Sequence, residues 1–161
     1  MAASLSLRVY TGAGPTESSS VSGIDLISAD NATNSLANRQ ANPITVGTNS
    51  YEKWVALKID TKPANIVNNF KVWGDGGVMT STTLKFTAGY ATYSQGVTAT
   101  STIADTAFTS YTSTSKATWD TTSYTNTNQT TKYLVFQLQV ASDAAPGNWT
   151  QETVYYSYDE S

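Results

Sequence analysis

Six of the twelve acidic residues of this sequence are candidates for acid–base chemistry. Glycosidases use two carboxylates, one as the acid and the other as the base or nucleophile. Here the acids stand singly near turn residues, where carboxylates usually cap the backbone or face solvent. We therefore expect them not to form a catalytic pair. The six residues are Asp60, Asp75, Asp105, Asp120, Asp143 and Glu152.

Other catalytic and metal-binding chemistry is limited by the residue types that the chain lacks. The sequence contains no Cys and no His. Disulfides, thiolate nucleophiles, Cys-ligated zinc and the most common general base are therefore excluded. The run Gly74-Asp75-Gly76-Gly77 lacks the Lys-Ser/Thr pair of a phosphate loop and the repeated ligands of an EF-hand, which favours a flexible hairpin turn. We expect no metal, no cofactor and no enzymatic activity.

Aromatic side chains are the other group that could form a site, because exposed Trp and Tyr rings stack on sugars or anchor protein interfaces. Trp54 and Trp73 fall in predicted strands, which favours core packing, and Trp54 is expected to cover the second side of its sheet. Trp119 and Trp149 lie in polar or turn-rich segments, which favours exposed contacts. We expect an interface formed by Gly12, Gly14, Pro15, Trp119, Tyr124 and Trp149.

The charge content limits the kinds of partner that the chain can bind. Only 13% of the residues are charged, the net charge is −3, and no stripe of Lys and Arg is present. Phosphate backbones and anionic membranes are bound through such stripes, so neither nucleic acid nor membrane is expected as a partner. The first residues show no basic segment followed by an apolar one, which predicts synthesis in the cytoplasm without a signal peptide.

The elements that must position these residues are predicted to be strands. Thr is abundant and favours strands, whereas Ser and Asn favour turns and caps. The clearest strand is residues 133–140, where Leu134, Phe136, Leu138 and Val140 alternate with a second face. A C-terminal strand is expected to pair with it. The predicted strands are residues 5–10, 21–28, 51–60, 66–73, 78–86, 133–140 and 149–158, and residues 30–48 are expected to form a long ordered loop.

Strands separated by Gly, Pro and Asn turns, without an amphipathic helix, predict an all-β fold. The expected architecture is one antiparallel β-sandwich over residues 1–161, of immunoglobulin-like or jelly-roll type. Two polar segments contain too few apolar residues to pack onto the core along their whole length. We expect an extended N-terminal arm over about residues 1–20 and a long loop over about residues 98–129, both ordering on binding.

Three blocks of sequence carry a resemblance to a known class of protein. They are EKWVALKID (residues 52–60), NNFKVW (68–73) and PGNWTQETVYYSYDE (146–160). These blocks resemble stretches of tailed-bacteriophage virion proteins, near the capsid decoration, or cement, proteins. The resemblance implies a virion protein that binds the major capsid protein on the outer shell, together with copies of itself, as a dimer or trimer. The alternative is a carbohydrate-binding or adhesion module that grips glycans with exposed aromatics.

Overall fold

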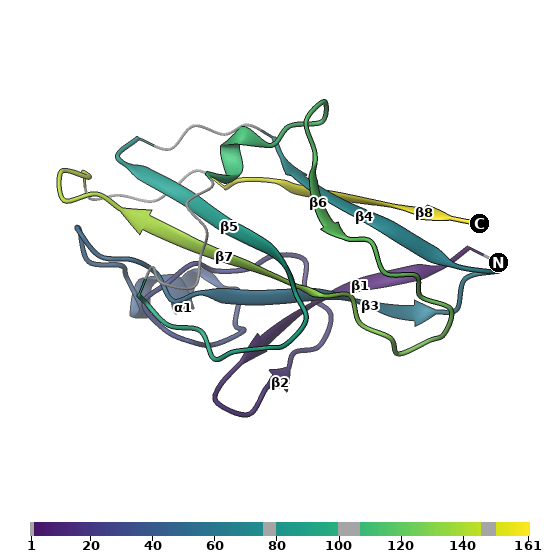
Figure 1. The fold of residues 1–161 in the computed structure, drawn as a ribbon. Coiled ribbons are helices and arrows are strands. Elements are labelled where there is room, and N and C mark those ends of the chain that lie inside the picture. Colours follow the sequence, from purple (N-terminus) through teal and green to yellow (C-terminus); the bar gives the residue numbers. More distant parts are fainter. Residues whose placement is uncertain (1, 76–79, 100–106, 146–150) are drawn as a thin grey trace.

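Two antiparallel β-sheets face each other and enclose the main core (Figure 1). The chain is described by a computed structural model over residues 2–75, 80–99, 107–145 and 151–161. The strand order is β2-β1-β3-β7-β5 in the first sheet and β6-β4-β8 in the second. This architecture confirms the predicted all-β sandwich. The bounds are β1 Ser4–Thr11, β2 Thr16–Glu17, β3 Lys53–Thr61, β4 Val67–Gly74, β5 Thr82–Tyr90, β6 Ala117–Asp120, β7 Tyr133–Val140 and β8 Val154–Glu160.

Strand β7 has the bounds predicted from its alternating sequence. It lies between β3 and β5, and its neighbours follow the antiparallel registers Val55↔Leu134 and Phe86↔Phe136. Because successive side chains of a strand point to opposite faces, every second residue of β7 faces the other sheet. The buried residues on this face are Leu134, Phe136, Leu138 and Val140, as the sequence predicts.

The opposite face of the first sheet carries a second, smaller apolar cluster. Trp54 packs there against the rings of Tyr90, Tyr93 and Tyr133, with ring centroids 5.1, 5.5 and 5.9 Å away. Tyr10 joins the cluster through an edge-to-face contact of 5.0 Å with Tyr133. The expectation that Trp54 covers the second side of the sheet is therefore confirmed.

The last strand pairs differently from the prediction. β8 pairs with β4 in the second sheet, with Val72 opposite Tyr156 and Trp73 opposite Tyr155, and it does not pair with β7. Alternation along a sequence fixes which residues of a strand share a face, but it leaves the neighbouring strand undetermined. The connection from β7 to β8 therefore crosses between the sheets.

The connection from β4 to β5 also joins the two sheets. The predicted hairpin at residues 74–77 is thus wrong, because β4 and β5 belong to different sheets. If the short strands β2 and β6 are set aside, the remaining strands can be lettered in chain order. They are A (β1), B (β3), C (β4), D (β5), E (β7) and F (β8). The first sheet then reads A-B-E-D and the second contains the pair C-F, which is the order of the immunoglobulin sandwich rather than a jelly roll.

Several segments outside the main strands differ from their predicted form. Residues 21–28 form no strand, and the predicted loop at 30–48 contains helix α1, Leu36–Ala41, which is capped by the Ser35 side chain. The loop at 98–129 contains β6 and a short 3-10 helix, Phe108–Ser110, and several of its aromatic residues are buried. Isolated aromatics are sufficient to hold a polar segment on the core. No helix in the described parts of the chain is long and apolar enough to cross a membrane.

The beginning of β1 and the end of β8 meet across the two sheets (Figure 1). The backbone N–H of Ala3 donates to both carboxylate oxygens of Glu160, at 2.9 and 3.1 Å. The hydroxyl of Tyr158 donates to the carbonyl oxygen of Ala3 at 3.4 Å. These contacts hold the two sheets together at this end of the sandwich.

Replacement of Phe136 by Ala tests the assignment of the core face. Phe136 is 3% exposed and contacts the Phe108 ring at 5.2 Å, so its loss leaves a cavity in the core. We expect Phe136→Ala to lower the free energy of unfolding by about 3 to 5 kcal/mol in denaturant melts. Leu36→Ala, at a residue that is 56% exposed, should change it by less than about 0.5 kcal/mol. A loss below about 1 kcal/mol for Phe136→Ala would contradict this assignment.

Candidate functional site

Two of the residues predicted to form an exposed interface are part of the core. Trp119 is buried, and its indole N–H donates to the carbonyl oxygen of Lys132 at 2.8 Å. Tyr124 is also buried, and its hydroxyl donates to the Asp120 carboxylate at 2.6 Å. The prediction of surface contacts by Trp119 and Tyr124 is wrong, because the strand β6 turns Trp119 inward and Asp120 provides Tyr124 with a buried acceptor.

Asp120 is the polar anchor of this segment. Its carboxylate accepts hydrogen bonds from the Lys132 and Thr122 backbone N–H groups as well as from the Tyr124 hydroxyl. Burial by itself disfavours the charged form, but these bonds stabilise it and hold the pKa of Asp120 below its ordinary value. Asp120 is therefore an ionised structural group rather than a proton donor.

The turn that contains Gly12, Gly14 and Pro15 joins β1 to β2; Gly14 and Pro15 are exposed, and Gly12 is partly buried. Gly12 has a φ of 81°, which glycine adopts without strain. Its N–H donates to Asp30, and its carbonyl oxygen accepts from the Tyr93 hydroxyl at 2.8 Å. The segment is thus folded onto the first sheet, and the predicted extended arm over residues 1–20 is wrong. Trp149 lies outside the described residues.

The segment that follows this turn is also fixed to the sheet. The Ser18 backbone N–H donates to the Val9 carbonyl oxygen, and the Val9 N–H donates to the Ser18 hydroxyl, each at 2.9 Å. The Glu17 carboxylate lies 2.8 Å from the Lys58 ammonium. An arm that orders only on binding could be deleted without loss of stability. Deletion of residues 12–20 would instead remove these bonds and destabilise the fold.

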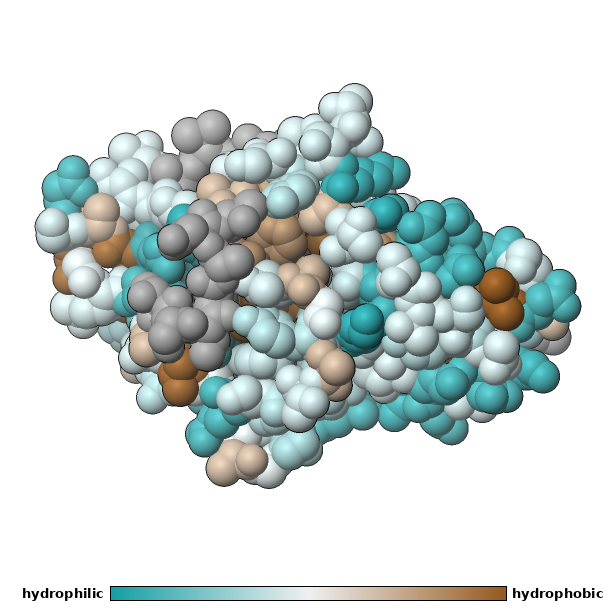
Figure 2. Space-filling view, in the orientation of Figure 1, coloured by the Kyte–Doolittle hydropathy of each residue, from teal (hydrophilic) through white to brown (hydrophobic). Residues whose placement is uncertain are grey.

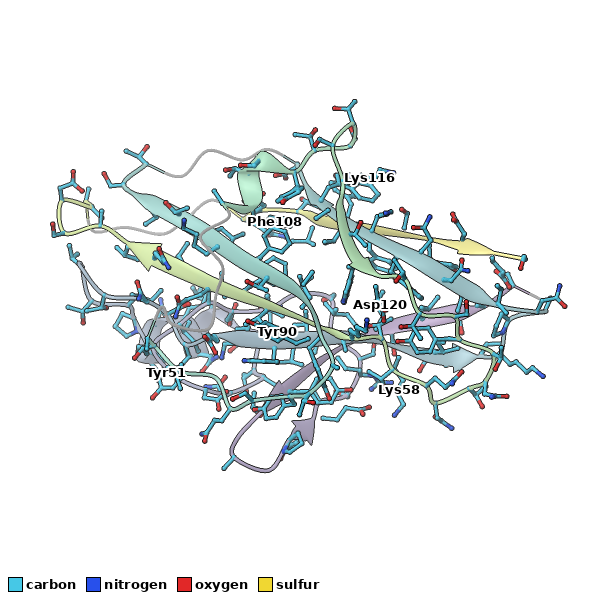
Figure 3. The ribbon with its side chains drawn as sticks, in the orientation of Figure 1. Tyr51, Lys58, Tyr90, Phe108, Lys116 and Asp120 are labelled. Carbon is cyan, nitrogen blue, oxygen red and sulfur yellow. The ribbon has the colours of Figure 1, made fainter. Side chains whose placement is uncertain are left out.

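The outer face of the second sheet carries a row of side chains that we call the aromatic row: Lys116, Trp73 and Tyr155. The Trp73 and Tyr155 rings are stacked at 5.8 Å with an interplanar angle of 16°, and the Lys116 ammonium lies 4.1 Å from the centroid of the Trp73 ring. Figure 3 shows Lys116 on the upper sheet and Phe108 between the sheets. Because β4 lies between β6 and β8, Lys116 and Tyr155 approach Trp73 from opposite sides.

Sequence reasoning misplaced Trp73, which was expected in the core. A signal that could have placed it correctly is the alternation within β4. Phe70 and Val72 are buried, whereas Lys71 and Trp73 occupy the alternate positions and are only partly buried. A Trp that shares a strand face with Lys belongs to the outer face, where its ring covers sheet surface and meets cross-strand neighbours.

Three consecutive residues of β8 form the most exposed apolar stretch among the described strands. Val154, Tyr155 and Tyr156 are 39, 45 and 41% exposed. Among the described strands β8 pairs only with β4, so it lies at the edge of the second sheet. Exposed apolar side chains on an edge strand mark a place where another chain can add.

Among the described residues, the candidate carboxylates do not gather in a groove. Asp60 lies 3.3 Å from the Arg8 guanidinium, Asp143 is in an exposed turn, and Asp105 lies outside the described residues. Two open grooves, with volumes of about 280 and 560 Å³, have no carboxylate among the residues that line them. The first opens between β5 and β6, where Figure 2 shows apolar surface at the centre of the view. No group of three or more acidic residues that could hold a metal ion occurs in the described residues.

Among the candidate acids that the structure describes, the fold brings Asp75 and Glu152 together. Asp75 follows β4 and accepts a hydrogen bond from the Thr153 N–H at 3.1 Å. Burial, and then the charge of Asp75, raises the pKa of Glu152, whose oxygens have no hydrogen-bond partner among the described residues. Glu152 also approaches Gly74 so closely that a Cβ at Gly74 would overlap its carboxylate. A raised pKa favours the protonated form of Glu152, which reduces the cost of burying it.

Comparisons of the chain with protein family models, curated proteins and solved structures found no match.

A buried lysine is a further polar group that the sequence pattern did not explain. Lys53 in β3 is 1% exposed, and its ammonium nitrogen lies 2.7 Å from the carbonyl oxygens of Ala29 and Asn31. These bonds attach the segment before α1 to the first sheet. Burial lowers the pKa of Lys53 to about 8, although the nearby Asp30 and Asp25 act in the opposite direction. A neutral amine has two N–H donors, which matches the two carbonyl acceptors.

The lowered pKa of Lys53 predicts an alkaline rise in stability. Between about pH 8 and pH 10 the unfolded chain holds this proton and the folded chain does not, so stability increases with pH. Above about pH 10 the trend reverses, because burial raises the pKa of Tyr10 and Tyr93 to about 12 and the unfolded chain ionises first. Denaturant unfolding from pH 7 to 11 should show a maximum near pH 10, with a rise on the order of 2 kcal/mol.

Lys53→Met provides the control for this pH dependence. Met has no titratable group, so the rise between pH 8 and 10 should disappear whatever the absolute stability of the variant. A wild-type curve that is flat or falling over this range would show that Lys53 remains charged in the folded protein.

Proposed function

We propose that the protein is a non-enzymatic structural component of a virion that binds the outer capsid surface and stabilises the particle. The observation that carries the proposal is the aromatic row on the outer face of the second sheet. It is supported by the exposure of Tyr155, which is 45% exposed at the end of this row. The specific partner, a major capsid protein, comes from the resemblance of three sequence blocks to phage decoration proteins.

The chemistry of the aromatic row suits a protein partner. Trp and Tyr are the residues that most often dominate the binding energy of protein interfaces, since they bury a large area at a low cost in side-chain entropy. The surrounding outer face is rich in hydroxyl and amide side chains, such as Thr118, Ser157 and Asn69. Polar groups of this kind can be satisfied across an interface without the desolvation of many ions.

The arrangement of the Trp73 ring favours protein over sugar as the partner. A pyranose stacks on an open aromatic face. Trp73 has Tyr155 stacked on one side and the Lys116 ammonium on the other, so its ring faces are already occupied. The cation also adds a favourable interaction with the ring that a sugar would have to replace.

A glycan-binding module is the second candidate, and Tyr155 is the observation that favours it. This residue is 45% exposed at the outer end of the aromatic row, and its ring is stacked on Trp73 on one side. A sugar could stack on the remaining face of Tyr155. In this case the isolated protein would bind glycans on an array, and it would not sediment with particles.

Trp73→Ala tests the proposed capsid attachment. Removal of the central ring of the aromatic row should weaken co-sedimentation with purified capsids of the encoding virus by about tenfold or more, as for other interface anchors. The melting temperature should fall only modestly, because Trp73 belongs to neither apolar cluster. Leu36→Ala is the matched control and should bind as the wild type does.

Two results would contradict the proposed function. One is the absence of wild-type protein from purified particles, as seen by electron microscopy or sedimentation. The other is unchanged capsid binding by Trp73→Ala. Glycan binding that Tyr155→Ala abolishes, without capsid binding, would support the second candidate instead.

A further inference from the structure

The free edge of β8 presents a regular row of backbone groups that have no strand partner among the described residues. In an antiparallel ladder, the N–H and C=O groups of alternate residues point to the same neighbour. The Asp75 N–H donates to the Thr153 carbonyl oxygen, and Ile66 and Ser161 exchange both bonds, so the odd-numbered residues of this strand face β4. The even-numbered residues therefore direct their backbone groups to the free edge. They are Val154, Tyr156, Tyr158 and Glu160.

Two side chains of β8 face the interior of the sandwich and yet remain exposed. Val154 lies opposite Gly74, and Tyr156 lies opposite Val72, and both of these β4 residues are buried. Val154 and Tyr156 therefore point toward the inner side of the second sheet. Their exposed fractions of 39 and 41% show that this edge of the sandwich lacks a cover.

The strand order indicates what is missing from this edge. β8 occupies the position of strand F, and in the immunoglobulin sandwich strand G lies beside F and antiparallel to it. No strand among the described residues takes this position. An added strand would bond the free backbone groups and cover Val154 and Tyr156 at once.

We propose that β8 of a second copy of this chain takes this position, so that two molecules join through an antiparallel β8–β8 pair. A two-fold axis makes the contact the same for both copies, and each β8 then serves as the missing strand of the other. The two three-stranded sheets become one continuous six-stranded sheet. This inference goes beyond the proposed capsid function and stands on the edge strand alone.

The distribution of charge along β8 supports the antiparallel pairing of two copies. The acidic residues Asp159 and Glu160 lie at one end of the strand, and the apolar residues Val154 and Tyr155 lie at the other. With the axis at Ser157, the acidic end of each copy lies against the apolar end of the other. A parallel arrangement would place like charges opposite each other, which is unfavourable.

The same register brings aromatic side chains together. Tyr156 of each molecule lies opposite Tyr158 of the other, and cross-strand aromatic pairs of this kind are favourable.

The length of the strand sets the strength of the contact. Seven residues span about 24 Å at about 3.4 Å per residue, so the strand pair alone is smaller than a standard stable interface. We therefore expect a reversible dimer that dissociates in about the micromolar range. Sedimentation equilibrium between about 1 and 200 µM covers this range.

Tyr156→Pro tests the proposal at the level of one backbone group. The N–H of residue 156 points to the free edge, and edge strands tolerate Pro at such positions. We expect wild-type protein to be dimeric at the highest concentration and Tyr156→Pro to be monomeric, with a weakening of at least tenfold. The circular dichroism spectrum should be retained. Tyr156→Lys is the second variant, because it keeps the backbone and adds an inward-pointing charge that blocks edge pairing.

Leu36→Lys is the matched control, since it adds the same charge at an exposed apolar residue of α1, away from β8. It should dimerise as the wild type does. The proposal is overturned if the wild type is monomeric throughout, if it forms trimers, or if both Tyr156 variants dimerise normally. A monomeric protein that binds capsids would contradict only the dimer inference. A dimeric protein that does not bind capsids would contradict only the proposed function.

Discussion

The contact between the two sheets depends on the ring of Phe108. This ring packs edge-to-face against Phe86 and Phe136 of the first sheet, with centroids 5.1 and 5.2 Å away. On its other side it approaches Gly74 of β4 so closely that a Cβ there would lie 3.0 Å from the ring. One side chain from an otherwise polar segment therefore joins both layers, and the absence of a side chain at Gly74 makes the space for it.

The parts of the fold that could be predicted are those set by local alternation. β7 was predicted with its correct bounds, and Trp54 was placed on the correct side of its sheet, because each depends only on which residues share a face. Strand neighbours could not be predicted in this way. The partner of β8 depends on contacts between residues more than eighty positions apart, such as Trp73 and Tyr155, about which alternation carries no information.

The candidate surface was less accessible to sequence reasoning than the fold. Trp119 was expected outside because its neighbours are polar, yet the acceptor on Lys132 and the short strand β6 bury it. Trp73 was expected inside because it lies in a strand, yet it shares its face with Lys71. Local polarity does not report the burial of Trp119, whereas strand parity with Lys71 does indicate the outer position of Trp73.

The contact between Ala3 and Glu160 has a consequence for mechanical force. Because β1 and β8 meet at the same end of the sandwich, tension applied through these two residues pulls the sheets apart at that point. The hydrogen bonds of the β1–β3 and β4–β8 ladders would then break one after another, as in unzipping, rather than together as in shear. A load carried through the face of the second sheet would instead be shared by all three of its strands. The molecule is therefore expected to be soft when stretched between residues 3 and 160 and stiff when held by its outer face.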